Sequence, residues 1–321
     1  MNLSIYCDAK HEGLWFRNLS RSLSLAKFHK IGKRGTNPKI IEKLIHYDRP
    51  DIILTSGDIP VLVLEKTSEV PSGHNVGQRL GRMVRALEHE IAAIMFMPFD
   101  AKKHGKYAAL CNLNARVLDC YLKMWTIHET PALAVNWPCD NNHELVIDGS
   151  EDSAISSVVD CFINSGFKHD CTFFTEHKKI MENEYLERVK TKNSYQKPPP
   201  SVKIVSTNKL VEKIQERTDY TNNIPHDWFS RKESVLYKIE MNEQKCRRED
   251  PYTGMQFLYD YQHCRNGKKP ENKYRNLVID IPKVSLSKWL ESNPNCDDRK
   301  SVMWYSTANA LLLKDGIITL R

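Results

Sequence analysis

The sequence predicts a mixed α/β fold in which a central mixed β-sheet is flanked by helices. Three observations lead to this expectation: a strand hairpin over residues 50–67, a strongly amphipathic helix over residues 75–91, and a fully apolar strand over residues 92–96. Helix and strand signals that alternate in this way are typical of α/β units. The 321 residues are enough for a sizeable buried core and comfortable for two domains.

The first third of the chain gives its elements in the order helix, hairpin, helix and strand. A helix begins after Pro38, with a one-sided apolar stripe of isoleucine and leucine over residues 40–45. Two short apolar strands, residues 52–54 and 59–64, flank the turn-forming Ser56-Gly57-Asp58. In the next helix, residues 75–91, the apolar side chains keep helical spacing for four turns, which indicates one buried face.

Residues 108–190 continue the same domain, with helical patterns at 115–124, 154–163 and 177–189 and an apolar strand at 132–135. The run Lys197-Pro198-Pro199-Pro200-Ser201 then forces an extended backbone. It is either a linker between domains, which we favour, or a stiff surface loop. We therefore expect a first domain over residues 1–196. The region 202–321, mostly helical or α+β, would then serve target recognition or dimerisation.

Charge is distributed unevenly along the chain. Residues 1–107 carry 17 Lys and Arg against 11 Asp and Glu, residues 108–196 carry 8 against 13, and residues 197–321 carry 22 against 16. Two basic segments that flank an acidic one suit a polyanionic partner, although a solvated surface gives the same pattern. The nine cysteines occur without a CxxC pair, which argues against a disulfide framework and a structural zinc site.

Several function classes are disfavoured by what the sequence lacks. Its longest apolar run is too short to cross a bilayer, and the first residues show no secretory pattern, so we expect a cytoplasmic protein without a membrane partner. The sequence holds no Gly-x-Ser-x-Gly elbow, which argues against a serine hydrolase. It holds no Walker A loop or GxGxxG motif, which argues against a nucleotide-driven motor.

The hairpin carries the chemistry that we expect. With the turn centred on Asp58, Asp51 lies opposite Glu65 on one sheet face, with Cβ atoms about 5 Å apart. Two carboxylates this close repel each other unless a cation lies between them, and oxygen ligands suit Mg²⁺. Such an ion can polarise a phosphodiester and activate a water molecule. The competing interpretation is that Asp51 is a turn residue and Glu65 an exposed carboxylate at the strand end.

Residues 37–97 resemble the PD-(D/E)XK nuclease superfamily, and type II restriction endonucleases in particular. The likeness rests on Pro50-Asp51, on Glu65-Lys66-Thr67, on a loop with His74 and Asn75, and on the following Gln78-Arg79. It implies a restriction-endonuclease-like fold, with Asp51 and Glu65 as ligands of a catalytic Mg²⁺.

The sequence departs from this family at one position. The family's lysine normally falls two residues after the acidic residue, where this chain has Thr67. Either an irregularity turns Lys66 into the site, or another group such as Thr67 or Gln78 positions the attacking water. Glu42, on the preceding helix, is a further candidate carboxylate, although an exposed helical glutamate is the simpler interpretation.

Basic and polar side chains near the hairpin and in the C-terminal region are the candidate DNA contacts. The helix over residues 75–91 carries three arginines, placed to reach phosphates after the metal site. A solvated basic face, or core packing for the aromatic residues at 257–261, are the competing interpretations. The candidates are Lys33, Arg34, His74, Asn75, Arg79, Arg82, Arg85, Arg247, Arg248, Arg265, Lys268 and Lys269.

Together these patterns predict a Mg²⁺-dependent endonuclease that hydrolyses double-stranded DNA at a specific sequence. A palindromic target would pair with two-fold protein symmetry, so we expect a homodimer in that case. One alternative is a repair or mobile-element nuclease that recognises DNA structure rather than sequence. The other is a catalytically silent DNA-binding regulator, which Thr67 at the lysine position motivates.

Overall fold

Six strands form the first sheet, which is mixed, as the sequence predicted. The pairs β1–β3 and β3–β4 are antiparallel, and the remaining neighbours are parallel. A separate two-stranded hairpin joins β6 (Asp100–Lys103) to β7 (Ala109–Asn112). In spatial order the strands of the sheet are β2 (Lys27–Lys30), β1 (Leu3–Cys7), β3 (Ile52–Ser56), β4 (Ile59–Lys66), β5 (Ala92–Met97) and β8 (Ala132–Asn136).

The C-terminal region is built on a second mixed sheet of five strands, where the sequence indicated only a mostly helical or α+β region. Its central strand is buried at every position, as expected for a strand with parallel neighbours on both sides. In spatial order the strands are β13 (Ile317–Thr319), β12 (Ala310–Leu313), β11 (Asn276–Ile281), β10 (Glu233–Lys238) and β9 (Val202–Ser206).

The helices include those expected near residues 40, 80, 120, 160 and 185, while the first one was not predicted. No helix in the described ranges is both long and apolar enough to cross a membrane. The α-helices are α1 (Lys10–Asn18), α2 (Lys39–Leu44), α3 (Asn75–Leu87), α4 (Ala115–His128), α5 (Asp152–Asn164), α6 (Thr172–Thr191), α7 (Thr207–Gln215), α8 (Met255–Tyr259) and α9 (Leu286–Ser292). Shorter turns are η1 (Arg21–Leu23), η4 (His226–Ser230), η5 (Glu243–Lys245) and the π-helix η6 (Asp260–Cys264).

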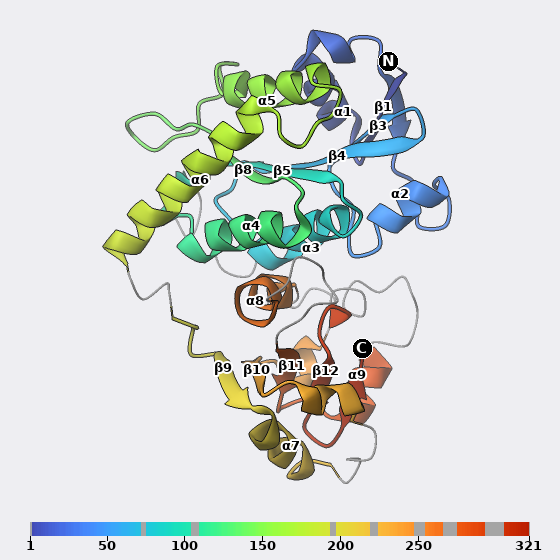
Figure 1. The fold of residues 1–321 in the computed structure, drawn as a ribbon, viewed down its shortest axis with the longest axis vertical. Helices are drawn as coiled ribbons and strands as arrows, with labels where there is room; N and C mark the ends of the chain where they lie inside the picture. Colours follow the sequence, from blue (N-terminus) through green and yellow to red (C-terminus); the bar gives the residue numbers. More distant parts are fainter. Residues whose placement is uncertain are drawn as a thin grey trace.

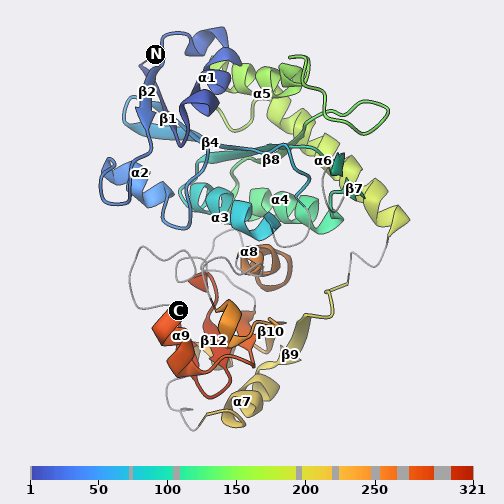
Figure 2. The same cartoon turned by 180° about the vertical axis from the view of Figure 1, so that it is seen from behind.

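These elements stack in layers. In the computed structural model, residues 2–71, 75–103, 109–192, 197–218, 224–246, 254–265, 275–292 and 305–320 are described. Figure 1 shows α1 and α5 on one face of the first sheet and α3 and α4 on the other. Helix α8 lies between α3 and α4 and the second sheet, and α7 lies at the far end, as the reverse view in Figure 2 also shows.

Helix α3 is enclosed between the first sheet and α8. Its apolar side chains, such as Leu80 and Met83, are buried against the sheet. On its other side, a Cβ at Gly81 would lie only 3.0 Å from the ring of Phe257, so glycine allows the close approach of α8. One apolar core therefore runs from the first sheet through α3 and α8 into the second sheet.

Candidate active site

The β3–β4 hairpin brings Asp51 and Glu65 together at its open end. The turn is formed by Gly57, which has a φ of +59°, and Asp58, and a register shift between Leu54 and Thr55 follows. Beyond this shift Ile52 pairs with Leu64, and one more step along the register places Asp51 opposite Glu65. The turn thus differs in detail from the expected one, but the predicted carboxylate register is present.

Hydrogen bonds tie the two carboxylates to each other's strand. The Asp51 amide donates to Glu65 Oε2 over 3.3 Å, and the Lys66 amide donates to Asp51 Oδ2 over 2.8 Å. Glu65 is fully buried, and the Asp51 side chain is 14% exposed. Burial, followed by the charge of Glu65, raises the pKa of Asp51 to about 8. At neutral pH this pair therefore favours a bound proton or a nearby cation.

Two arginines of α3 supply positive charge to this pair. Arg79 Nη1 lies 2.7 Å from Glu65 Oε1, and Arg82 Nη1 contacts the same oxygen. Arg82 also lies 3.5 Å from Asp51 Oδ1 and 3.2 Å from Asp48 Oδ2. Arg79 and Arg82 were expected to contact DNA; in this structure both guanidinium groups neutralise buried carboxylates, which would be costly to leave unpaired.

Arg85 and Arg265, two further expected DNA contacts, are also engaged by other groups of the protein. Arg85 donates to the Lys43 carbonyl over 2.8 Å and pairs with Glu88 at 2.9 Å. The side chain of Arg265 is fully buried and donates to Asp260 Oδ2 over 2.7 Å. Helix α8 packs against α3, and η6, which precedes Arg265, packs against α4. Arg265 is therefore interior and not accessible to DNA in this structure, whereas Arg85 is partly exposed.

The remaining basic candidates near the N-terminus lie in a surface loop. Lys33 is exposed, whereas Arg34 is partly buried and lies 2.9 Å from His46 Nδ1. Glu42 accepts hydrogen bonds from the amides of Gly35 and Asn37, which lower its pKa. Glu42 therefore orders this loop and is not brought to the Asp51–Glu65 pair.

Lys66 and Thr67 do not complete the carboxylate site. Successive side chains of a strand point to opposite faces, and the Lys66 ammonium lies over the rings of Trp15 and Trp137, at 3.9 and 4.7 Å from their centroids. Thr67 Oγ1 accepts the amide of Glu69 over 3.1 Å, which closes a local turn. The interpretation in which an irregularity turns Lys66 toward the carboxylates is thus corrected.

Other candidates cannot be placed. The backbone of Asn75 and Gln78 belongs to α3, but their side chains lie outside the described part of the structure. His74, Arg247, Arg248, Lys268 and Lys269 lie outside the described residues altogether.

Sequence reasoning missed two acidic neighbours of the pair. Asp48, three residues before Asp51, is 5% exposed and holds Arg82 from the side away from Glu65. Glu12, at the start of α1, adds negative charge that raises the pKa of Asp51 further. Asp48 could have been predicted as a neighbour of the pair because it lies close to Pro50-Asp51 in the chain. Glu12 could not, because it belongs to a helix that the sequence pattern did not indicate.

Asp51 and Glu65 are the residues that could hold a divalent cation. In the described ranges, no group of three or more His, Cys, Asp and Glu side chains has a metal-binding arrangement. Mg²⁺ needs fewer protein ligands, because it commonly takes one or two carboxylates and keeps water or phosphate oxygens. The pair therefore fits Mg²⁺ in ligand type and number, and binding would require Arg82 to move away from Asp51.

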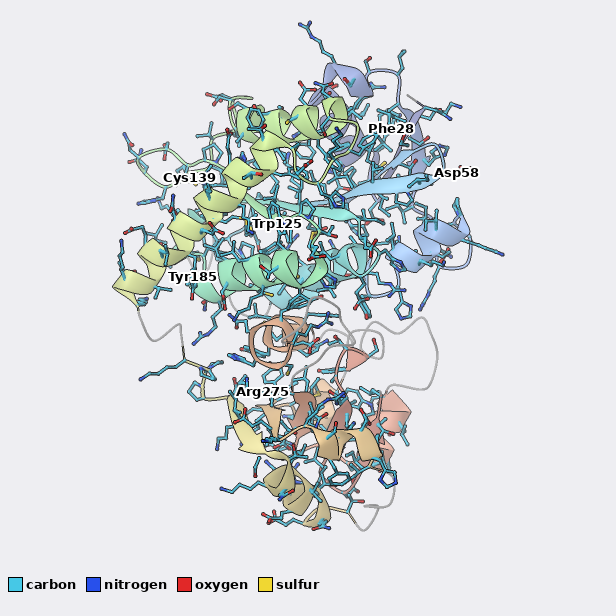
Figure 3. The ribbon with its side chains drawn as sticks, in the orientation of Figure 1. Phe28, Asp58, Trp125, Cys139, Tyr185 and Arg275 are labelled. Carbon is cyan, nitrogen blue, oxygen red and sulfur yellow. The ribbon has the colours of Figure 1, made fainter. Side chains whose placement is uncertain are left out.

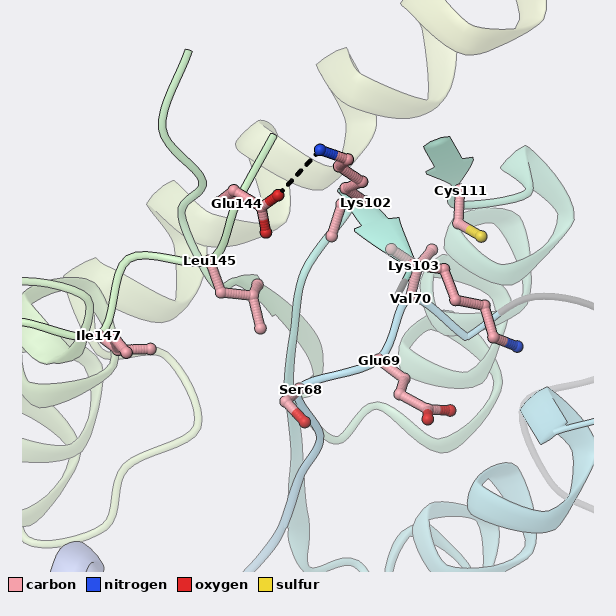
Figure 4. Close-up of a pocket in the computed structure, with 10 residues that line it drawn as sticks. Ser68, Glu69, Val70, Lys102, Lys103, Cys111, Glu144, Leu145 and Ile147 are labelled. Atoms are coloured by element: carbon pink, nitrogen blue, oxygen red, sulfur yellow. Dashed lines mark ion pairs between the residues drawn. The ribbon is translucent and has the colours of Figure 1, made fainter. Parts of the chain in front are cut away.

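Two adjoining cavities open at the carboxyl end of β4, where ligands commonly bind in open α/β sheets. The smaller one, about 260 Å³, is lined by Trp15, Lys66 and Trp137, among others, and shares Ser68 with its neighbour. The larger one, about 550 Å³, lies beside the β6–β7 hairpin. Figure 4 shows its Lys102–Glu144 ion pair, at 3.2 Å, on one side and Glu69 and Lys103 on the other.

Comparisons with known proteins add no information about this site. No protein-family description, curated protein or solved structure matches this chain.

Proposed function

We propose that this protein is a Mg²⁺-dependent endonuclease that hydrolyses phosphodiester bonds of double-stranded DNA, with a PD-(D/E)XK-type core over residues 37–97. The observation that carries the proposal is the buried contact between Asp51 and Glu65 across the β3–β4 hairpin. The order of hairpin, α3 and parallel β5 supports it, because the same order underlies the family resemblance. A type II restriction enzyme acting as a homodimer is the form that we favour.

In the proposed reaction the residues near the hairpin have separate roles. Asp51 and Glu65 bind the cation, and when bound the ion stabilises charge on the phosphate and lowers the pKa of a water molecule. With a cation held by these carboxylates, Arg82, anchored by Asp48, would donate hydrogen bonds to the scissile phosphate. The Lys66 ammonium takes no part at the carboxylates, since it lies on the other sheet face.

The test is nicking of supercoiled plasmid with and without Mg²⁺. We expect Asp51→Asn and Glu65→Gln to lower the cleavage rate by at least about 100-fold, since each removes charge that stabilises the transition state. Asp58→Asn is the matched control, because this carboxylate is exposed at the outer tip of the same hairpin (Figure 3). Unchanged digestion by Asp51→Asn would overturn the site assignment.

A second candidate function is a DNA-binding protein without catalysis. The observation in its favour is that arginines already neutralise Glu65, while Thr67 stands where the family has lysine. A gel-shift measurement separates the two: binding to duplex DNA, with no cleavage by the wild type at any Mg²⁺ concentration, would favour the regulator. Discrete fragments from one plasmid would favour restriction over a structure-specific nuclease.

A further inference from the structure

The smaller cavity lies on the sheet face opposite the carboxylates but at the same strand end. It is lined by side chains of α1, of the β4 end and of the segment after β8, namely His11, Glu12, Trp15, Lys66, Thr67, Ser68 and Trp137. Lys66 and Thr67 follow Glu65 directly, so the cavity adjoins the proposed catalytic pair.

The aromatic walls of this cavity are held rigidly. The Trp15 indole donates to Asp152 over 2.9 Å, and the Trp137 indole donates to the Val146 carbonyl over 2.8 Å. Phe96 stacks on both indoles, with interplanar angles of 10° and 5°. The N–H edges are engaged in hydrogen bonds and Phe96 stacks on both rings, so a ligand would meet the ring faces over which the Lys66 ammonium lies.

The polar groups of the cavity suit a neutral planar ligand. In the described part of the chain, the Lys66 ammonium contacts the two indole rings and meets no hydrogen-bond acceptor. Asp152, Glu151 and Glu12 lie close enough to the Lys66 ammonium to interact with its charge. These acidic neighbours repel a phosphate, and the ammonium repels an organic cation. A flat, uncharged ring with hydrogen-bonding edges satisfies both conditions.

We propose that this cavity binds an unstacked nucleobase of the substrate, with Trp15 and Trp137 stacking on it and Lys66 donating to an acceptor on its edge. The inference rests on the proposed nuclease function and adds that the enzyme takes one nucleotide out of the base stack. Stacking on aromatic side chains is the usual means of holding an unpaired base. Glu12, on the cavity rim, supplies a carboxyl group for exocyclic amines.

The experiment measures binding of fluorescently labelled single-stranded octamers of thymidine and of deoxyadenosine in EDTA, by anisotropy. We expect saturable binding to at least one octamer, and an affinity lowered at least about tenfold by Trp15→Leu and by Lys66→Met. Trp125→Leu and Lys178→Met are matched controls, since they remove another indole–ammonium contact, of 5.1 Å, on a different surface (Figure 3 labels Trp125). An octamer of abasic residues should bind as weakly as the variants bind the normal octamers.

Three results would overturn the proposal: no saturable binding to either octamer, equal binding of the abasic octamer, or full affinity in folded Lys66→Met. Circular dichroism verifies the fold of each variant, and Lys66→Met keeps the test valid if Trp15→Leu does not fold. Asp51→Asn should keep its octamer binding. Base binding without plasmid cleavage would therefore refute the nuclease proposal alone, and cleavage without base binding would refute the pocket alone.

Discussion

Glu65 and Asp280 are two fully buried carboxylates that the protein neutralises in different ways. Asp280, on β11, accepts Lys213 over 2.7 Å and also contacts Arg217, so one negative charge meets two positive ones. Around Glu65, three carboxylates (Asp48, Asp51 and Glu65) share the two guanidinium groups of α3.

The difference teaches what separates a structural ion pair from a candidate metal site. The Asp280 cluster has a surplus of positive charge and no reason to attract a cation. The Glu65 cluster has one carboxyl group more than it has guanidinium groups, and the pKa of Asp51 rises to about 8, so that Asp51 keeps its proton at neutral pH unless a cation binds. Burial alone is common to both clusters, so the facing second carboxylate is the informative feature.

The largest effect is expected from removing a shared arginine. Arg82→Met leaves Asp48 and Glu65 with less positive charge in a buried environment and should lower the free energy of unfolding by about 3–5 kcal/mol. Mg²⁺ should restore part of this loss in urea titrations. Arg217→Met, the control in the Asp280 cluster, should not respond to Mg²⁺; an equal response of both variants would break the comparison.

Asp280→Asn should destabilise the protein by about 2–3 kcal/mol at pH 7. The substitution removes the charge that Lys213 and Arg217 share, and the loss is limited because their side chains are 31% and 19% exposed. Thermal and urea unfolding provide the measurement. A stability equal to that of the wild type would mean that this buried pair is not structural.

Asp51→Asn should stabilise the protein, whereas Asp280→Asn should destabilise it. The pKa of Asp51 is about 8 in the folded protein against an ordinary 3.8, so the folded state keeps the proton longer and the wild type loses stability as pH rises from about 4 to about 8. Asparagine resembles the protonated acid, so the variant should be more stable than the wild type at pH 8 and equal to it at pH 4. A variant less stable at pH 8 would contradict the raised pKa.

The smallest effect is that of Mg²⁺ on the wild type. At ten times the dissociation constant, binding to the folded state adds about 1.4 kcal/mol to stability. Differential scanning calorimetry should detect the accompanying rise in Tm. Asp51→Asn should abolish this rise, and Trp15→Leu, in the cavity on the other sheet face, should leave it intact.

The sequence allowed the carboxylate pair to be predicted because a hairpin is a local structure. Strand period and turn residues determine which side chains face each other, and the register shift near Leu54 compensated for the misplaced turn centre. The same alternation correctly argued that Lys66 faces away from Glu65. Predictions that depended on residues close in the chain therefore agreed with the structure.

Predictions that depended on contacts between residues far apart in the chain did not agree with the structure. The polar stripe of α3 was interpreted as a DNA-facing surface, whereas Arg79 and Arg82 pair with carboxylates of the hairpin and α8, about 175 residues later, packs against the same helix at Gly81. Likewise, nothing near Arg265 in the sequence indicates that its side chain is fully buried. The second sheet was missed because β10, β11 and β12 are short and pair across long intervening segments, so their pairing leaves no local signature.

The contact between Gly81 and Phe257 has a consequence for how the protein can be divided. Helix α3 holds the carboxylates with one side and receives α8 on the other, so a fragment that ends at the proline run would bare the outer side of α3 to water. The amino-terminal half is therefore unsuited to expression by itself. A chimera in which another sequence replaces the carboxyl-terminal half would need to preserve this aromatic contact to keep α3 enclosed.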